Sequence, residues 1–468
     1  MTKRHFIAFL FISLGTNWVI AQDSITISYQ EFISVVKKYH PLAYKYQLEN
    51  KIAEKEIQNA RGNFDPQLSA KLGEKEIGNT TYYQQQAVEL AIPTWYGVEL
   101  NGSYNKYQGE KLNNSDTKGE IYQLGITIPL AKNLIIDKRR AWLQQQKLAQ
   151  KMTFAEQQLK TNELMQEAEN TYWQWLASYQ IYKLHSKAVT INEERLQFTK
   201  KTYNYGERAA IDTVEAFTQK QNFELLKQES YLNFLQQTQE LYAFLWKENF
   251  EPYDINQVIY PKENINENPN FFDFEFLVQK IKNQEIELHA SIRYYLEKGN
   301  ILEVEKKLKW QSFLPKLDFT YNFLSTNEYR SEYLPPFDNN FQYGLKLEIP
   351  IFLRQARANY EIAKLKIDQN NQDILWKKQD LATKITQYSN EVRSYSEQIN
   401  LAKKNLDNYQ KLLRAEEIRY TNGESSLFLI NSRESKLIES QEKLIQIQAK
   451  YLKSYNVLKW LYEGFSTP

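Results

Sequence analysis

Two very long stretches of this chain contain neither glycine nor proline, and they limit what the chain can fold into. They span residues 137–203 and 353–420. At a rise of about 1.5 Å per residue, an uninterrupted helix over either stretch would be on the order of 100 Å long. Helices of ordinary globular domains average roughly three to four turns. The two stretches therefore predict extended, coiled-coil-like helices.

The apolar residues of both stretches recur in alternating steps of four and three. A sustained seven-residue repeat keeps one seam against a neighbouring helix and predicts left-handed supercoiling. A solvent-exposed two-stranded coiled coil would explain the seam alone, but Trp173 and Phe198 lie off it and indicate contacts on more than one side. The seam positions are Met165, Ala168, Tyr172, Trp175, Tyr179 and Tyr182 in the first stretch, and Leu381, Ile385, Tyr388, Val392, Tyr395, Ile399, Ala402, Leu406, Tyr409 and Leu413 in the second.

Each long stretch ends in a similar turn, "YNYGERAAID" from Tyr203 and "YTNGESSLFL" from Tyr420. The glycine of each turn lets the backbone take the left-handed conformation that ends one helix before the next begins. Further helices are expected on both sides of the long ones. Their ranges are 209–247 and 425–463 after the turns, and roughly 42–61 and 273–311, with Gly299 as a weak point, before the long helices.

The N-terminal residues have the pattern of an export signal. "MTKRH" supplies positive charge, "FIAFLFISLG" is too short to span a bilayer, and Val19 and Ala21 hold the small-residue positions of a cleavage site. We expect cleavage after Ala21; the alternative is a buried N-terminal strand or helix. Beyond the signal, no apolar run approaches the about 20 residues of a membrane helix, so entry into a membrane would be by strands.

The chain has no cysteine, which excludes disulfides, thiol catalysis and a lipid anchor on cysteine.

The spacing of landmarks along the chain indicates a duplicated half. Gly423 follows Gly206 by 217 residues, and the proline of "LEIPI" follows the proline of "ITIPL" by 221 residues. A repeat of this length is far longer than a solenoid unit. We therefore divide the chain into a signal peptide, a first structural repeat, a polar linker and a second structural repeat, at residues 1–21, 22–247, 248–270 and 271–464.

Between the helical segments lie stretches of alternating polarity. In "YQLGITIPL", Tyr122, Leu124, Ile126 and Ile128 share one face, and glutamine, glycine and threonine share the other. "YGLKLEIPI", "LDFTYNF" and "PTWYGVELNGSY" repeat the pattern, which is typical of outer-membrane strands. A sheet on a soluble core is the alternative. The export signal favours the membrane, as does an aromatic content of 14% with 33 tyrosines.

These strands are too few to close a barrel within one chain. We expect two strands in the second half and two to four in the first, whereas the smallest barrels need about eight. Since backbone amides in lipid must all be paired, the barrel must be shared among several copies. The two halves also differ in length, because Pro66 and Pro129 are 63 residues apart but Pro315 and Pro350 only 35. The extra residues of the first half would be either a further hairpin in the barrel or an external loop.

The duplicated order of helix, strands, long helix, glycine turn and helix resembles the TolC-type outer-membrane efflux family over roughly residues 28–464. The resemblance rests on "HPLAYKYQLENKIAEKEIQNARGNFDPQLSA", "WQSFLPKLDFTYNF", "ITIPL", "LEIPI" and the two Y-x-x-G-E turns. It implies a mainly α fold whose duplicated hairpins form a periplasmic tunnel, with strands contributed to a shared trimeric barrel in the outer membrane. It further implies a homotrimer in contact with outer-membrane lipid, a periplasmic adaptor protein and an inner-membrane transporter that drives export.

The same resemblance implies roles for the two turns. Gly206, Glu207, Gly423 and Glu424 would form hairpin tips that meet the adaptor. Tyr203, Tyr420 and Arg208 would hold the periplasmic mouth shut, and Asp212 and Glu215 would form an acidic ring. The second turn departs from the family's pattern, because Ser425, Leu429 and Ser432 stand where basic and acidic residues are expected. Ordinary helix caps and solvated surface are the alternative for each of these residues.

We find no pattern of a catalytic, metal or cofactor site. Three of the four histidines, His40, His185 and His289, are isolated and the fourth lies in the signal; His40 precedes a proline at a helix start and is expected to be structural. The paired carboxylates Glu416 and Glu417 are expected on a solvated helix face. A formal net charge of +2 gives no reason to expect nucleic-acid binding.

The sequence thus predicts a passive outer-membrane export duct. A secreted coiled-coil adhesin or scaffold is the alternative. For the duct, drugs, metal ions and proteins all remain open as cargo.

Overall fold

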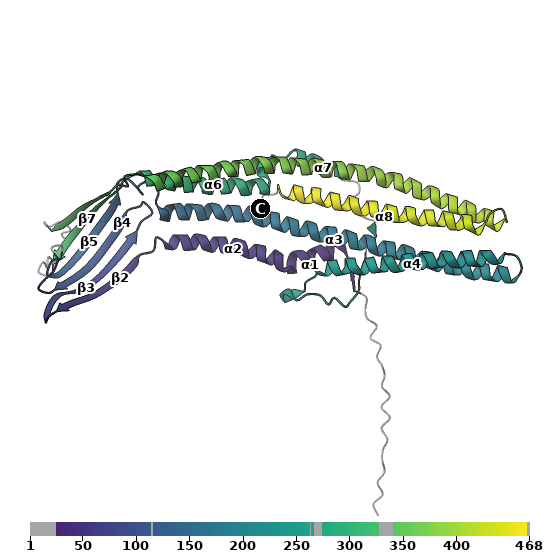
Figure 1. Ribbon diagram of the computed structural model, residues 1–468, viewed down its shortest axis with the longest axis horizontal. Helices are drawn as coiled ribbons and strands as arrows, with labels where there is room; N and C mark the ends of the chain where they lie inside the picture. Colours follow the sequence, from purple (N-terminus) through teal and green to yellow (C-terminus); the bar gives the residue numbers. More distant parts are fainter. Residues whose placement is uncertain (1–24, 114–115, 263, 266–273, 327–339, 466–468) are drawn as a thin grey trace, which may run out of the picture.

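The computed structural model describes residues 25–113, 116–262, 264–265, 274–326 and 340–465 as one elongated body with a sheet at one end and helices along the rest (Figure 1). The expected signal peptide, 1–21, lies outside the described residues. None of the helices in these ranges has both the length and the hydrophobicity needed to cross a membrane.

Two helices run almost the full length of the helical part. They are α3 (Lys138–Asn204) and α7 (Arg354–Thr421), of 67 and 68 residues. Asp137 begins α3 as its N-cap, since its carboxylate accepts the backbone N–H of Arg140 at 2.8 Å. The predicted lengths of the two long helices are confirmed to within one or two residues at each end, because nothing in either stretch breaks a helix.

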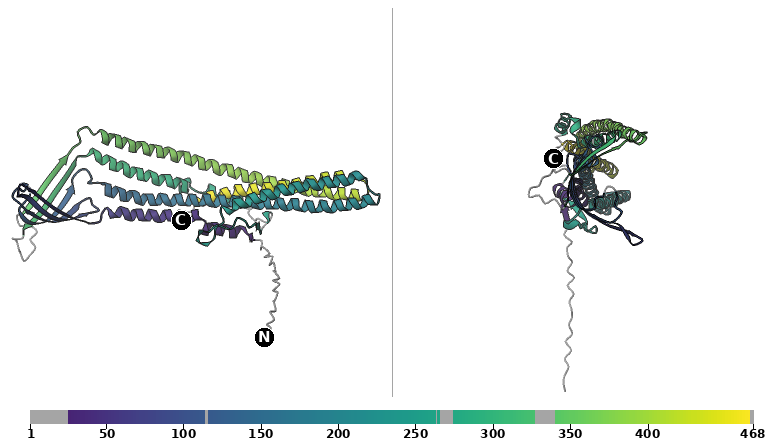
Figure 2. Two further views of the ribbon diagram at one scale, coloured as in Figure 1. Left: turned by 60° about the horizontal axis from the view of Figure 1, so that its bottom comes forward. Right: turned by 90° about the vertical axis from the view of Figure 1, so that its left-hand side faces the viewer.

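Shorter helices lie against the long ones in two sets. Near the sheet, α3 packs between α2 and α6, and α6 also contacts α7; toward the other end, α3 contacts α4 and α8, and α8 contacts α7 (Figures 1 and 2). Among the described residues, each half of the chain therefore contributes one long helix and three shorter ones. The shorter helices are α1 (Tyr29–Tyr39), α2 (Pro41–Gly62), α4 (Ala210–Tyr242), α5 (Phe274–Lys282), α6 (Ala290–Trp310) and α8 (Leu427–Glu463), with 3₁₀ turns η1 (Glu248–Phe250), η4 (Ile286–Leu288) and η5 (Gln311–Phe313).

The prediction of one helix over 273–311 is wrong in its break point. The chain leaves helical conformation between α5 and α6, whereas Gly299, the expected weak point, lies inside α6. His289 is the reason: its Nδ1 accepts the backbone N–H of Ser291 at 3.2 Å and so begins a new helix. His40 begins α2 in the same way, with Leu42 as donor at 3.2 Å, which confirms its structural role.

The main core lies about half-way along the molecule and is rich in aromatic rings. Trp175 of α3 is fully buried, and its indole N–H donates to Thr238 of α4 at 3.0 Å. Tyr172, Phe234 and Tyr451 bring α3, α4 and α8 together around it. The expected linker 248–270 takes part, because β6 (Ile259–Pro261) pairs in parallel with β1 (Ile25–Ile27).

Six antiparallel strands form the sheet, in the order β2-β3-β4-β5-β7-β8. The described residues of the first half supply four strands and those of the second half two. The strands are β2 (Gln67–Ile77), β3 (Thr80–Pro93), β4 (Glu99–Gln108), β5 (Gly119–Pro129), β7 (Lys316–Thr326) and β8 (Phe341–Glu348). The extra residues of the first half are thus strands, because β3 and β4 have no counterpart among the described residues of the second half. Pairing of β5 with β7 joins the two halves.

Candidate functional site

The two glycine turns lie at the end of the molecule farthest from the sheet and have the same geometry (Figure 1). Gly206 and Gly423 have φ of 76° and 79°, the left-handed region that glycine adopts without strain. In the first turn the N–H of Glu207 donates to the carbonyl of Thr202 at 3.0 Å; in the second, Glu424 donates to Arg419 at 2.8 Å. Both turns are therefore Schellman caps of the long helices.

A contact between the two turns links the halves of the chain. The guanidinium of Arg208, just after the first glycine, lies 4.1 Å from the ring centroid of Tyr420, just before the second glycine. A cation over a tyrosine face contributes about 0.5–2 kcal/mol, depending on its exposure to water. Burial raises the pKa of the Tyr420 hydroxyl, an effect that nearby Arg208 opposes.

Behind this contact the four helices meet in a small apolar cluster. Leu196 of α3, Ala216 of α4 and Leu427 of α8 are each at most 2% exposed, and Tyr420 of α7 packs against them. Tyr203 does not belong to this cluster and is 45% exposed. The structure thus brings together Arg208 and Tyr420, one from each hairpin, and leaves Tyr203 apart from them.

A buried ion pair next to the cluster joins α3 to α8. Arg195 forms two hydrogen bonds with Glu434, Nη1 to Oε2 at 2.6 Å and Nη2 to Oε1 at 3.1 Å, and their side chains are only 15% and 6% exposed. Asn192 donates to the same carboxylate at 3.1 Å. A bidentate pair of this kind holds two helices in one register, because the geometry of both planar groups must match.

The acidic residues predicted for a ring differ in their surroundings. Glu215 of α4 accepts a hydrogen bond from Asn431 of α8 at 3.2 Å, so it helps to join the hairpins. Asp212 is half-buried in the first turn of α4, where a carboxylate is stabilised by the helix dipole. Glu207 and Glu424 are exposed at the turns themselves.

The expectation that Glu416 lies on a solvated face is wrong. Its side chain is 7% exposed, and its Oε1 accepts the hydroxyl of Ser425 at 2.6 Å. Arg419 and Arg433 lie 3.7 Å from its two carboxylate oxygens. Ser425 occupies in the second turn the position that Arg208 has in the first, so the two turns use this position differently. The sequence offers no local signal for this, because the partners come from α7 and α8 together.

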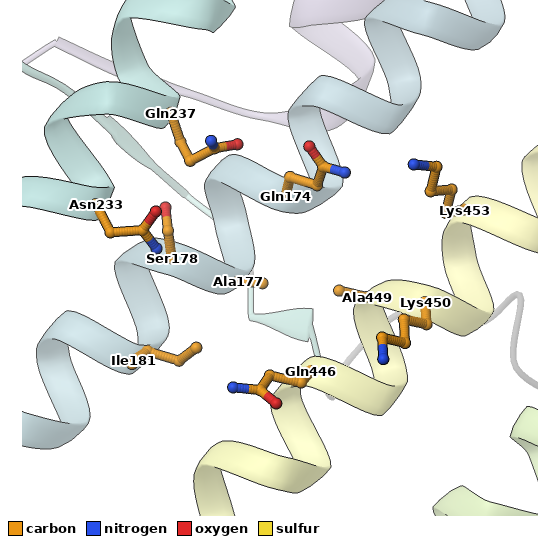
Figure 3. Close-up of a pocket in the computed structure, with 10 residues that line it drawn as sticks. All are labelled: Gln174, Ala177, Ser178, Ile181, Asn233, Gln237, Gln446, Ala449, Lys450 and Lys453. Carbon is orange, nitrogen blue, oxygen red and sulfur yellow. The ribbon is translucent and has the colours of Figure 1, made fainter. Parts of the chain in front are cut away.

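A groove of 340 Å³ lies between α3, α4 and α8 (Figure 3). Its lining includes glutamines, an asparagine and the lysines Lys450 and Lys453, but most of its exposed surface is apolar. The hydroxyl of Ser178 donates to the carbonyl of Trp175 at 2.7 Å, and the lining contains no histidine or carboxylate that could act as a base for it or for the lysines. The residues around this groove thus lack a catalytic constellation.

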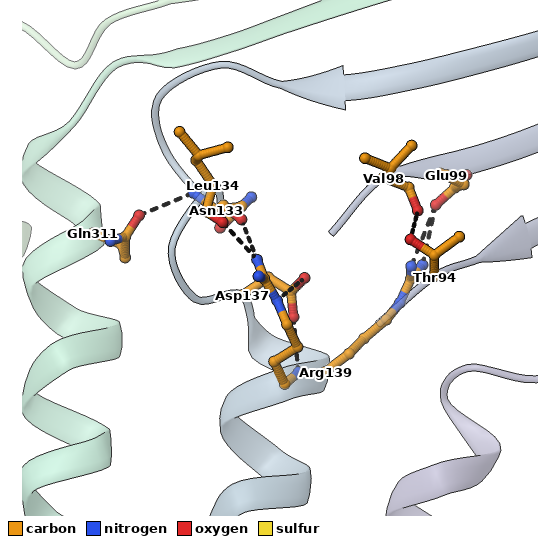
Figure 4. Close-up of polar contacts among 9 residues, drawn as sticks. Thr94, Val98, Glu99, Asn133, Leu134, Asp137, Arg139 and Gln311 are labelled. Atoms are coloured by element: carbon orange, nitrogen blue, oxygen red, sulfur yellow. Dashed lines mark hydrogen bonds and ion pairs between the residues drawn. The ribbon is translucent and has the colours of Figure 1, made fainter. Parts of the chain in front are cut away.

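Polar contacts fix the sheet to the helices at the other end (Figure 4). Arg139 pairs with Glu99 of β4 at 3.3 Å, and Gln311 of the second half accepts the N–H of Asn133 at 3.1 Å. Arg140 donates to the carbonyls of Asn133 and Leu134. Both halves therefore contribute contacts to one junction between the sheet and the helices. Among the described residues no group of His, Asp and Glu could hold a metal ion.

Residues 307–461 match the model of one protein family, described as "Outer membrane efflux protein". No curated protein matches the sequence. The outer membrane protein VceC of Vibrio cholerae is 13% identical, with a TM-score of 0.66 over 93% of this chain and 96% of that chain. The CmeC outer membrane channel of Campylobacter jejuni is 15% identical, with a TM-score of 0.62 over 93% and 85%. For the open state of the MtrE outer membrane channel of Neisseria gonorrhoeae the values are 12%, 0.61, 93% and 88%.

The likeness to these structures shows a common fold. Together with the family match, it confirms the predicted resemblance to the TolC-type family and the predicted fold class. It also confirms an outer-membrane location with the helical part in the periplasm. The adhesin alternative receives no support from either comparison.

Proposed function

We propose, from the family match of residues 307–461 and the TolC-type fold, that three copies of this chain form a passive exit duct. The duct crosses the outer membrane and the periplasm, and an inner-membrane transporter drives export through it by way of a periplasmic adaptor protein. The observation that carries this proposal is the arrangement of both glycine turns at one end and all six sheet strands at the other (Figure 2).

Assembly of several copies follows from the edges of the sheet. All residues of β8 are exposed, as are all but one of β2, and neither edge has a hydrogen-bonded neighbour among the described strands. An open edge is not tolerated in lipid, so each edge must be paired with another copy. The number three comes from the resemblance to the family, and the mass of the purified protein in detergent tests it.

The tips are the gate of the proposed duct. Arg208 and Tyr420 join the hairpins of one chain at the mouth, and the buried pair of Arg195 and Glu434 holds the same helices a little further in. An adaptor that binds the exposed turns at Glu207 and Glu424 would act on this contact. In this proposal the chain has no catalytic activity and no cofactor, and the repeats 22–247 and 271–464 act as two hairpins joined through 248–270.

Single-channel conductance in planar bilayers tests the duct and its gate. We expect a small conductance for the wild type and a clearly larger one for Tyr420→Ala and for Arg208→Ala, because each removes the contact between the hairpins. Tyr203→Ala is the matched control: the same substitution at the equivalent position of the first turn should leave conductance unchanged. Folded trimers without any conductance would overturn the duct. Equal effects of Tyr203→Ala and Tyr420→Ala would overturn the assignment of the gate.

Adaptor contact is tested separately. Reversing both exposed charges, in Glu207→Lys with Glu424→Lys, should weaken binding of the purified adaptor while conductance of the isolated channel stays unchanged. Unaltered binding would place the adaptor contact away from the turns.

A further inference from the structure

The two outer strands of the sheet carry matching patterns. On β8, Tyr343, Leu345 and Leu347 share one face, and on β2, Leu68 and Leu72 do; each of these five side chains is more than half exposed. Resting on the proposed trimer, we propose that β8 of one copy pairs antiparallel with β2 of the next, with Glu348 opposite Gln67. Three seams of this kind close a barrel of eighteen strands, six from each copy.

The direction of the strands permits this seam. The six strands of the described sheet alternate in direction, so β2 and β8 run in opposite directions within one chain. Placing copies side by side around an axis therefore sets β8 beside an antiparallel β2. An odd number of strands would have required a parallel seam within an otherwise antiparallel barrel.

The stagger of the sheet supplies the register. A row of directly opposed residues begins at Gln67, the first residue of β2, and ends at Gln342, six residues before the last residue of β8. The sheet is therefore staggered: measured from the strand ends nearest the helices, the row lies at the end of β2 but six residues away from the end of β8. Aligning those ends in the trimer places Gln342 opposite Gly73 of the next copy and Glu348 opposite Gln67. The row consists of Gln67, Ala91, Asn101, Gly125, Asn322 and Gln342.

This stagger agrees with the geometry of closed barrels. The stagger amounts to six residues over six strands. With about 3.4 Å per residue and about 4.8 Å between strands, it corresponds to a strand tilt of about 35°. Membrane barrels have tilts of roughly 35–45°. Eighteen strands at this tilt enclose a backbone cylinder about 34 Å across. Four strands per copy, twice the number in the second half, would give about 23 Å at the same tilt.

The register also matches side chains across the seam. On the apolar face it opposes Leu347 to Leu68, Leu345 to Ala70 and Tyr343 to Leu72. On the polar face it opposes Lys346 to Ser69 and Gly344 to Lys71, so no like charges meet. Opposed apolar pairs on one face stabilise an antiparallel pair, and opposed like charges destabilise it.

Neighbouring registers are worse. A shift of two residues in one direction sets Lys346 opposite Lys71, and a shift of two in the other sets Glu348 opposite Asp65. A shift of one residue would turn the apolar side chains of one strand toward the polar face of the other. The proposed register is therefore the one that satisfies both the stagger and the charges.

The seam continues into the helical part. In the chain α2 leads into β2, and α7 continues from β8. These two helices lie at opposite ends of the row α2, α3, α6 and α7 (Figure 2). Ile52 of α2 and Leu365 of α7 are 59% and 65% exposed. Pairing of the strand edges would bring α7 of one copy beside α2 of the next, the two helices that carry these exposed apolar side chains.

Cysteine cross-linking in the full-length protein tests the seam, since the natural chain has no cysteine. Leu345→Cys with Ala70→Cys probes the apolar face, and Lys346→Cys with Ser69→Cys the polar face. Directly opposed Cβ atoms lie about 4.5–5.5 Å apart, within reach of a disulfide after small adjustments. With copper phenanthroline as oxidant, we expect covalent dimers and trimers on non-reducing gels for at least one pair. The single variants and the offset pairs of Leu345→Cys with Leu68→Cys or with Leu72→Cys should stay monomeric on these gels.

Native mass spectrometry of the same samples separates the possible failures. Trimers that cross-link through neither matched pair would overturn the seam and leave the proposed trimer intact. Cross-linking of an offset pair in preference to the matched pairs would overturn the register. A protein that remains monomeric in detergent would overturn the proposed trimer itself, and the seam with it.

Discussion

Replacing Glu434 by glutamine removes the charge that balances Arg195 between the two hairpins. The pair is bidentate, and both side chains are largely buried, with exposures of 15% and 6%. Removing one partner of a buried pair leaves the other charge unpaired, which destabilises by about 3–5 kcal/mol. Glutamine keeps one hydrogen-bond acceptor in place, so we expect a loss of about 3 kcal/mol in the free energy of local opening at this contact.

Hydrogen exchange measures this local opening in the detergent-solubilised protein. We expect amides of α3 and α8 around Arg195 and Glu434 to exchange roughly 100-fold faster in Glu434→Gln, the ratio that corresponds to about 3 kcal/mol. Glu439→Gln is the matched control on the same helix. Its pair with Lys436 has a distance of 2.8 Å, but the two side chains are 63% and 55% exposed. An exposed pair contributes at most about 1 kcal/mol, so exchange should change less than tenfold.

Equal changes in the two glutamine variants would refute the reasoning, because burial would then not decide the strength of the pair. A double variant, Arg195→Met with Glu434→Met, adds a second check. Removing both charges leaves no unpaired group, so this variant should exchange more slowly than Glu434→Gln.

Three further changes test the turns, the second-half helix cap and the strand–helix junction. Gly423→Ala should lower the free energy of unfolding by about 1–2 kcal/mol, measured by thermal unfolding, because alanine disfavours a φ of 79°. Burial lowers the pKa of His289 from 6.5 to about 4, so the unfolded chain takes up its proton first and stability is lost as the pH falls from about 6.5 to about 4. Urea unfolding should show a loss of about 2 kcal/mol between pH 7 and pH 5 that His289→Asn abolishes; an unchanged loss would assign it to other groups. Arg140→Ala should lower the unfolding temperature of the sheet, because two backbone carbonyls lose their donor, whereas Arg139→Ala, which removes an exposed pair, should change it little.

The sequence alone predicts the long helices and their turns because those features depend on local chemistry. Absence of glycine and proline over 137–203 and 353–420 leaves nothing to end a helix, and the structure has α3 and α7 over nearly the same residues. Gly206 and Gly423 are identified in advance because few other residues adopt their backbone conformation. Alternation of polar and apolar residues predicts β5, β7 and β8 for the same reason.

The sequence predicts two to four strands in the first half and does not decide among these numbers. Alternation indicates a strand at the start of β4, but β3 has mixed polarity, so the extra residues allow a hairpin or an external loop; pairing of β3 with β2 and of β4 with β5 decides it. The break before α6 was also missed. It depends on His289, which is 4% exposed and packs against Gly464, a residue 175 positions later in the chain.

Tertiary structure alone decides which charged residues are buried and which tyrosine meets an arginine. Glu416 and Glu434 belong to charged helix faces by sequence, yet both are buried against residues of another helix. The two turns are nearly equivalent in sequence, but Arg208 contacts Tyr420 while Tyr203 stays exposed. Local patterns determine the conformation of a segment because its own backbone and neighbouring side chains fix it. Partners more than two hundred residues apart are set by how the four helices pack, and no local pattern contains that information.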